Sequence, residues 1–320
     1  MKELLQVDRV NNYYQENGLG IFGKRNKVQV LKDVSFTIHP NEFFGLVGES
    51  GCGKTTLGNS ILGLIPYEGS ILVDGQPYSK KEKRNFARNV QAVFQDPLSA
   101  LNPRRTIGQT MEEPLKIHHI GDREERIRRV NEMLEMIGLD SSYRNRYPSE
   151  LSGGQRQRVC IGAALMLSPK LIVADEAVSA LDVSVGSQIL NLFRELHEKI
   201  ELSLLFISHN LNVVYYLCDR IAVMYRGNIV EIGTADDIYL NPQHPYTKLL
   251  LSAIPDIEAE VFHRKDNDEL ETTREDIPGA CCFYHRCPYT TEACKKEISL
   301  ICADEGSKEH FVRCPREKQS

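Results

Sequence analysis

The chain lacks any apolar stretch as long as the roughly 20 residues that a bilayer-crossing helix needs. This absence argues against an integral membrane protein, so a membrane role would have to come through other chains. The charged start and apolar core of a secretory signal peptide are also missing, since the opening residues MKELLQVDRV alternate in the manner of a strand. We therefore expect a cytoplasmic protein.

Basic blocks, internal repeats and low-complexity tracts are absent as well. The 320 residues carry 39 Lys and Arg against 44 Asp and Glu, a formal net charge of −5. A mildly acidic chain without a basic cluster is not expected to bind nucleic acid. Its length predicts two domains, or one large domain with an appendage.

What is present is a glycine-rich segment, GESGCGKTT, which fits the phosphate-binding pattern G-x-x-x-x-G-K-[ST]. Its glycines let consecutive backbone N–H groups point at one anion. Lys54 would contact the outer phosphates of a nucleotide, and the Thr55 hydroxyl would bind Mg²⁺. An apolar run at 43–47 predicts a buried strand before the loop, and 55–64 predicts a helix whose N-terminal dipole favours phosphate. The expected nucleotide-binding residues of the loop are Gly48, Glu49, Ser50, Gly51, Cys52, Gly53, Lys54, Thr55 and Thr56.

A second apolar run, LIVADE at 171–176, ends in two carboxylates. Asp175 is of the kind that holds Mg²⁺ beside a phosphate-binding loop, usually through water. Glu176 is one residue further, so it points to the other side of the strand end. Both could be ordinary charged residues at a strand terminus. Their presence as a pair in a chain with a phosphate-binding loop favours a catalytic role.

Other polar residues stand at similar places. Gln95 lies in VFQDP after a strand-like run, and His209 closes the run LLFISH. The segment LSGGQ opens a predicted helix with Ser152 as N-cap. Strands at 4–10 and 28–47, 71–75, 89–94, 171–174, 203–207, 221–224 and 228–232 alternate with helices, which predicts an α/β fold with a mostly parallel sheet.

In this order the segments resemble the motifs of ATP-binding cassette (ABC) ATPases, over about residues 4–255. The resemblance implies a P-loop NTPase with a RecA-like core, an antiparallel β-subdomain, and a helical subdomain at about 96–165. It implies ATP and Mg²⁺ as ligands, with Thr55, Gln95 and Asp175 near the metal. The catalytic residues it implies are Glu176, which activates the attacking water, His209, which contacts the γ-phosphate, and Gln95.

The resemblance also implies a stacking residue and a partner. Tyr14 would stack on adenine, with Tyr13 as the alternative. The signature residues Ser152, Gly153, Gly154 and Gln155 would complete the ATP site of a second cassette bound head to tail, with Asp182 at the seam. The chain departs from the family pattern at Ala177, Asn210 and Ala163, none of which removes a group assigned to chemistry.

Several stretches, above all NPQHPYTKLLLSAIP at 241–255, resemble the branch that imports dipeptides, oligopeptides or nickel. This branch implies a second ATPase subunit in a heterodimer, two transmembrane permease subunits, an external binding protein, and a peripheral place on the cytoplasmic face of the membrane. The alternatives are a non-transport ABC ATPase of DNA repair or ribosomes, and an ATPase regulated by metal or redox state.

Six of the nine cysteines fall between 281 and 314. We expect an acidic linker at 256–278 and a separate Cys-rich appendage at 279–320, which follow an ABC domain at 1–255. Four thiolates on short loops indicate a metal or iron–sulfur site, and the predicted ligands are Cys281, Cys287, Cys294 and Cys314. The stretch GACCFYHRCP resembles the tail of the same importers, which implies a [4Fe–4S] cluster. Zinc and reduced, unligated thiols remain open, and Cys282 or Cys302 could replace a ligand.

Overall fold

The computed structural model describes residues 3–16, 26–79, 82–254, 277, 279–303 and 309–315. The strands in these residues are β1 (Leu5–Glu16), β2 (Asn26–Ile38), β3 (Phe43–Val47), β4 (Glu68–Val73), β5 (Gln76–Pro77), β6 (Val90–Val93), β7 (Leu171–Asp175), β8 (Ser203–Ser208), β9 (Arg220–Tyr225), β10 (Asn228–Thr234), β11 (Ile301–Cys302) and β12 (Phe311–Val312). The α-helices are α1 (Lys54–Ile61), α2 (Lys83–Asn89), α3 (Pro97–Ala100), α4 (Ile107–Ile117), α5 (Arg123–Met136), α6 (Gly153–Leu165), α7 (Val183–Ile200), α8 (Leu211–Leu217), α9 (Ala235–Leu240) and α10 (Pro245–Ser252). Short 3₁₀ helices are η2 (Ser141–Asn145), η3 (Pro148–Glu150) and η5 (Glu292–Lys295).

The main sheet of the described chain has eight strands in the order β11-β12-β10-β9-β3-β8-β7-β6. Strands β9, β3, β8, β7 and β6 are parallel, whereas β10, β12 and β11 join antiparallel. Buried apolar runs such as Phe43–Val47 form the central strands, because a parallel sheet is covered on both faces. The predicted α/β fold with a mostly parallel sheet is confirmed.

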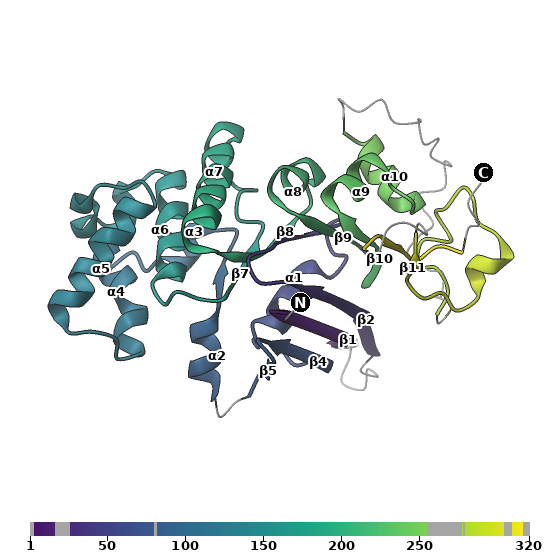
Figure 1. The fold of residues 1–320 in the computed structure, drawn as a ribbon, viewed down its shortest axis with the longest axis horizontal. Coiled ribbons are helices and arrows are strands. Elements are labelled where there is room, and N and C mark those ends of the chain that lie inside the picture. Colours follow the sequence, from purple (N-terminus) through teal and green to yellow (C-terminus); the bar gives the residue numbers. More distant parts are fainter. Residues whose placement is uncertain are drawn as a thin grey trace.

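A second sheet of the described residues is wholly antiparallel, with the order β2-β1-β4-β5. It lies below the main sheet in Figure 1, with α1 near the junction. The apolar run predicted as one strand at 28–47 is divided between the two sheets. The division falls at a turn in which Asn41 has φ +57°, a left-handed conformation that Asn tolerates well.

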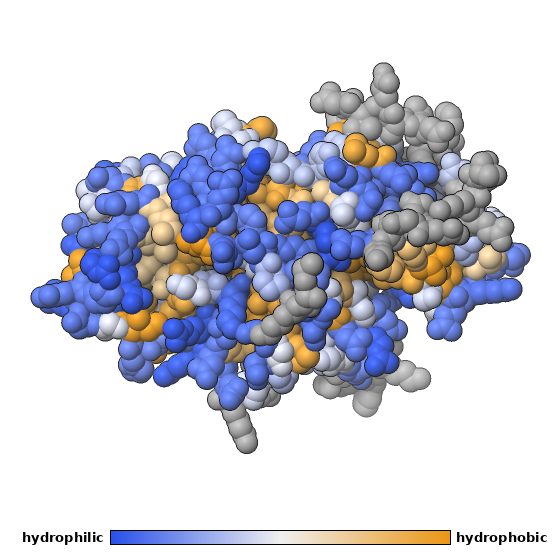
Figure 2. All heavy atoms as spheres, viewed as in Figure 1, coloured by the Kyte–Doolittle hydropathy of each residue, from blue (hydrophilic) through white to orange (hydrophobic). Residues whose placement is uncertain are grey.

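Helices α3 to α6 gather at one end of the molecule (Figure 1). Capping boxes begin two of them: Thr106 and Gln109 at α4, and Ser152 and Gln155 at α6. Their apolar faces, including Met111, bury into the same core as the main sheet. Figure 2 shows a largely hydrophilic exterior on this view, with apolar side chains in smaller spots.

The expectation of a separate Cys-rich appendage is not supported. Strand β12 pairs with β10, so residues far apart in the sequence extend one sheet (Glu231 opposite Val312). Phe283, 1% exposed, and Cys281 belong to the buried apolar cluster of the main domain. These residues pack in the core of the main domain and not in a core of their own. The predicted linker at 256–278 lies outside the described residues, apart from Ile277.

Of the helices in the described residues, none combines the length and the apolar character that a membrane crossing requires.

Candidate functional site

The glycine-rich loop, Asp175, Glu176 and His209 lie at the carboxyl edge of the parallel strands. In the sheet register Val47 lies opposite Ser208, Asp175 opposite Ile207, and Ala174 opposite Val93. The loops that leave β3, β7, β8 and β6 therefore start side by side. Ligands bind at this edge in open α/β sheets, because the loops and helix N-termini converge there.

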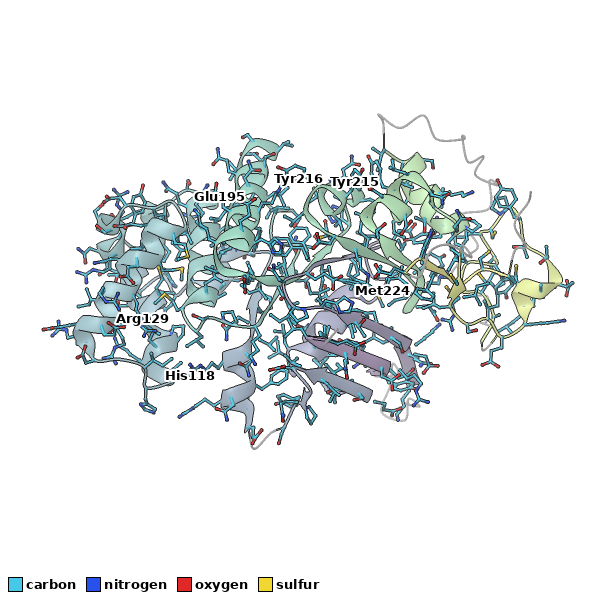
Figure 3. The ribbon with its side chains drawn as sticks, in the orientation of Figure 1. His118, Arg129, Glu195, Tyr215, Tyr216 and Met224 are labelled. Carbon is cyan, nitrogen blue, oxygen red and sulfur yellow. The ribbon has the colours of Figure 1, made fainter. Side chains whose placement is uncertain are left out.

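The glycine-rich loop runs between β3 and α1 in a form that depends on two of its glycines. A Cβ on Gly48 would lie 2.1 Å from the backbone oxygen of Met224, on β9 (Figure 3). Gly53, the N-cap of α1, has φ +110°, a conformation that favours glycine. The sequence motif thus folds as expected into strand, loop and helix.

Lys54 is the first residue of α1, and only 5% of it is exposed. Its ammonium donates hydrogen bonds to the backbone oxygens of Gly48, at 2.8 Å, and of Glu49, at 3.0 Å. These bonds hold the cation over the loop, where a phosphate would take the place of the carbonyl groups.

Asp175 ends β7 beside Thr55. Burial raises the pKa of Asp175, a hydrogen bond with the Thr55 side chain opposes the rise, and the nearby charge of Glu176 adds to it. Within the described residues its Oδ1 atom is buried and has no hydrogen-bond partner. A buried carboxylate oxygen without a partner, next to a hydroxyl, is a donor set that fits Mg²⁺.

Glu176 and His209 form a pair across the ends of β7 and β8. The His209 Nδ1 atom lies 3.1 Å from Glu176 Oε1, and the side chains are 55% and 21% exposed. Glu176 has φ +49°, a strained conformation for a glutamate, and its N–H donates to the Ile207 oxygen at 2.9 Å. Strain of this kind gathers at functional sites, where the surrounding structure enforces it.

Two departures from the family pattern have structural roles. Asn210 is the N-cap of α8, and its side-chain oxygen accepts from the backbone N–H groups of Asn212 and Val213. Asn serves at this position as well as Asp would. Ala177 is 1% exposed and packs in the main core.

Three predicted residues stand further out. Gln95 is exposed and follows the end of β6. Tyr14 is 47% exposed on β1, whereas the competing Tyr13 lies under the Lys27 ammonium, 5.8 Å from its ring centroid. Asp182 precedes α7 and is exposed without a side-chain capping bond.

The signature residues lie on α6, in the helical cluster. The Ser152 hydroxyl accepts from the Gln155 N–H at 3.3 Å, and the Gln155 amide donates to the Tyr143 hydroxyl at 3.0 Å. A Cβ on Gly154 would lie 2.4 Å from the Val185 side chain, so α6 and α7 approach closely there. The side-chain bonds of Ser152 and Gln155 thus stay within the helical cluster and do not join the glycine-rich loop.

The four predicted cysteine ligands lie near one another. Burial raises the pKa of Cys281 to about 12, and the neighbouring thiols of Cys282, Cys294 and Cys314 add to the rise. Burial likewise raises the pKa of Cys287, with contributions from Cys314 and Cys294. Over the described ranges, however, no group of three or more His, Cys, Asp or Glu side chains is arranged to hold one metal ion.

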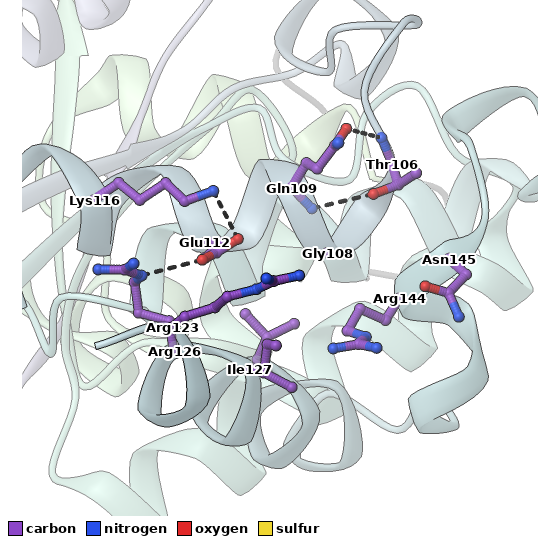
Figure 4. Close-up of a pocket in the computed structure, with 11 residues that line it drawn as sticks. Thr106, Gly108, Gln109, Glu112, Lys116, Arg123, Arg126, Ile127, Arg144 and Asn145 are labelled. Carbon is purple, nitrogen blue, oxygen red and sulfur yellow. Dashed lines mark hydrogen bonds and ion pairs between the residues drawn. The ribbon is translucent and has the colours of Figure 1, made fainter. Parts of the chain in front are cut away.

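A pocket of about 560 Å³ lies between α4, α5 and η2 (Figure 4). Glu112 crosses it and bonds Lys116 at 2.8 Å and Arg126 at 3.1 Å. Burial alone would raise the pKa of Glu112, but these two bonds lower it. None of the predicted site residues lines this pocket, which belongs to the helical cluster and not to the carboxyl edge.

Sequence reasoning gave no role to Tyr246 or Arg286, although both contact the glycine-rich loop. The stretch NPQHPYTKLLLSAIP marks the importer branch, and nothing in it predicts that its tyrosine bonds a distant residue.

Two family models match different regions of the chain. A family model described as ABC transporter matches residues 31–179, and one described as oligopeptide/dipeptide transporter, C-terminal region, matches 230–294. The oligopeptide transport ATP-binding protein AppF of Bacillus subtilis is 41% identical over 97% of this chain and 96% of its own length. The di/tripeptide transport ATP-binding protein DppF of Pseudomonas aeruginosa is 43% identical over 93% of this chain and 94% of its own.

Among solved structures, the ATP-binding cassette MJ0796, a dimer in a post-hydrolysis state with ADP and phosphate, is 30% identical. It superposes with a TM-score of 0.63 and covers 72% of this chain and 98% of its own.

Proposed function

The chain belongs to the ABC transporter family and is an ATPase, and we propose that it powers an importer of dipeptides or oligopeptides. The observation that carries the activity is the meeting, on one sheet edge, of Lys54, the Asp175–Thr55 pair and the Glu176–His209 pair. The matched C-terminal region and the peptide-transport relatives support the substrate class.

In this proposal the glycine-rich loop and Lys54 bind the phosphates of ATP. The Lys54 ammonium exchanges its bonds to the Gly48 and Glu49 carbonyl groups for bonds to phosphate oxygens. Thr55 and Asp175 would hold Mg²⁺, which supplies charge neutralisation on the phosphates. The exposed Tyr14 stacks on the adenine ring.

Glu176 accepts a proton from the attacking water, and His209 keeps its carboxylate in place. One ring nitrogen of His209 bonds Glu176, so the other is left to face the terminal phosphate. Gln95, just beyond β6, would contact the metal and the water.

The signature completes the site of a second cassette. The first N–H groups of α6 have no acceptor within the helix, so they form an anion site at Gly153 and Gly154. Because the Ser152 and Gln155 side chains bond within the helical cluster of their own chain, we place these groups on the ATP of a partner, with Asp182 at the seam. The partner is a second ATPase subunit, in a heterodimer.

The remaining partners are two permease subunits and an external binding protein, with this chain bound peripherally on the cytoplasmic face of the membrane. We test the function in proteoliposomes that hold the full chain with these partners. ATP hydrolysis and uptake of labelled dipeptides and oligopeptides should appear together, and Lys54→Ala should abolish both, whereas Lys295→Ala, at an exposed site, should not. Hydrolysis without peptide uptake, or uptake of nickel alone, would refute the substrate class, and hydrolysis stimulated by DNA or ribosomes would favour a non-transport ATPase.

A second proposal concerns the cysteines: Cys281, Cys287, Cys294 and Cys314 hold a [4Fe–4S] cluster. The supporting observation is that two of these residues are adjacent in space, because the Cys281 N–H donates to the Cys294 oxygen at 2.9 Å, although the arrangement in the described residues is not that of metal ligands. Protein purified without oxygen should absorb visible light and contain about four iron atoms per chain, and Cys287→Ser should lose both. Colourless protein with stoichiometric zinc would replace the cluster by a zinc site, and protein without metal would refute both.

A further inference from the structure

We infer that the C-terminal region positions the phosphate-binding loop through Glu49, with Tyr246 and Arg286 as the positioning residues. The inference rests on the proposed ATP site, but it concerns residues outside the ATPase motifs. Its basis is that three groups of Glu49, the second residue of the loop, are hydrogen-bonded: the N–H, the carbonyl oxygen and the carboxylate.

The backbone of Glu49 is fixed through both its N–H and its carbonyl group. The N–H donates to the Tyr246 hydroxyl at 2.9 Å. The carbonyl oxygen accepts from Lys54 Nζ at 3.0 Å and from the Cys52 N–H at 3.3 Å. Tyr246 therefore bonds the same residue whose carbonyl holds the lysine before nucleotide arrives.

The side chain of Glu49 is held by the C-terminal region. Arg286 Nη1 lies 3.2 Å from each carboxylate oxygen of Glu49. The Arg286 side chain is 16% exposed, and its guanidinium lies over the rings of Tyr225 and Phe283, at 5.9 and 5.8 Å from their centroids. Contacts with two rings limit the motion of the guanidinium, so this ion pair is better defined than a surface pair.

Burial and contacts with neighbouring residues fix Tyr246 in place. It is wholly buried at the start of α10, where its N–H donates to His244 Nδ1 at 3.1 Å. Its ring lies 4.5 Å from that of Tyr225 and 5.5 Å from that of Phe283. Burial also raises the pKa of Tyr246, so its hydroxyl stays neutral.

The three rings thus connect the matched C-terminal region to the loop. Phe283 and Tyr246, on α10, both belong to the matched region 230–294, whereas Tyr225 lies at the end of β9. The HPY sequence, His244 to Tyr246, consequently has a physical role, because it carries a hydroxyl to the phosphate-binding loop and holds it there.

A loop held in its binding form loses less freedom when nucleotide binds. Tyr246 and Arg286 bond Glu49 and none of the residues assigned to the chemical step, so we expect their loss to weaken binding and spare that step. We expect Tyr246→Phe and Arg286→Ala to raise KM for ATP by about three- to tenfold, with kcat within about twofold of wild type. Arg286→Lys should restore part of the loss, because a single nitrogen makes both bonds but an ammonium lacks the planar group that packs on the two rings.

The experiment measures ATP hydrolysis by the full chain assembled with its partner ATPase and permease subunits, and amide hydrogen exchange of the loop in the full chain without nucleotide. Tyr246→Phe should speed exchange at the Glu49 N–H, which no longer has its acceptor. Tyr215→Phe is the matched control, since that hydroxyl bonds Asp236 away from the site. In a double-mutant cycle, Arg286→Ala should add little to Glu49→Gln. Thermal unfolding of each variant separates loss of folded protein from loss of affinity.

Three results decide the inference. Raised KM with faster exchange, together with rescue by lysine, supports it. Unchanged KM and unchanged exchange in both variants, or a fall in kcat alone, overturns it. Faster exchange in Tyr246→Phe, combined with a wild-type assembly that hydrolyses no ATP, would support the contact and refute the proposed function.

Discussion

Two glutamate–histidine pairs lie on the main sheet, and they differ mainly in their access to water. Glu176 and His209 stand 3.1 Å apart at the carboxyl edge, 21% and 55% exposed. Glu231 and His310 stand 2.8 Å apart on the far side, between β10 and the C-terminal region, both 0% exposed. The same two side-chain types thus occur once at an open edge and once in the core.

Their partners explain the difference. The Glu231 carboxylate also accepts from the backbone N–H groups of Gln243, at 2.6 Å, and His244, at 3.0 Å, so each of its oxygens has a partner. The Glu176 carboxylate accepts from no backbone N–H group of the described residues, and it keeps capacity for water. A satisfied buried pair stabilises the fold, whereas a pair with spare capacity at an open edge is available for chemistry.

The largest expected effect is at the exposed pair. Glu176→Gln should lower kcat by about 10²–10⁴-fold with ATP affinity intact, because the carboxylate is needed only when water attacks. ATP should then trap the closed dimer. Steady-state hydrolysis and nucleotide binding by calorimetry measure the two quantities. Turnover within severalfold of wild type would remove Glu176 from this role.

The buried pair should respond in stability. Glu231→Ala leaves His310 and two backbone N–H groups without their acceptor and should cost about 3–5 kcal/mol of unfolding free energy. Urea denaturation of the full chain measures this loss. Glu195→Ala, at an exposed glutamate on α7 (Figure 3), is the control and should change little. Equal stability of the two variants would show that the buried pair is not structural.

The smallest of the three effects is expected at Ser152, which belongs to neither glutamate–histidine pair. Ser152→Arg puts a bulky cation at the proposed seam, so it should lower hydrolysis by at least about tenfold, or 1.4 kcal/mol, through lost dimer closure. ATP affinity of the isolated chain should stay nearly unchanged. Gel filtration with ATP, in the Glu176→Gln background, measures closure. If Ser152→Arg weakens ATP binding by one chain, the head-to-tail proposal is wrong.

Prediction from the sequence succeeded where the signal is local. The strand, glycine-rich loop and helix around Lys54 need only neighbouring residues, and so does the capping box at Ser152. Apolar runs predicted the central strands, because burial on both faces requires an apolar composition. The positions of Glu176 and His209 at strand ends could be predicted, since each follows an apolar run, but the bond between them could not.

What the sequence did not reveal depends on contacts between distant residues. Nothing near His310 indicates that it bonds Glu231, and nothing near Tyr246 indicates that it bonds Glu49. The cysteines predict a metal site, but they do not predict that Phe283 is buried and joins this region to the main core. Local periodicity cannot report pairings that only the tertiary fold creates.

The pairing of β12 with β10 also has a consequence for biosynthesis. During translation β10 emerges long before residues 311–312, so its outer edge stays unpaired until the later segment arrives. An open strand edge is a template for pairing with another chain. A nascent or proteolysed chain that lacks β12 would therefore expose an unpaired strand edge that can associate with another chain. Protection from self-association would come only when β12 pairs with β10.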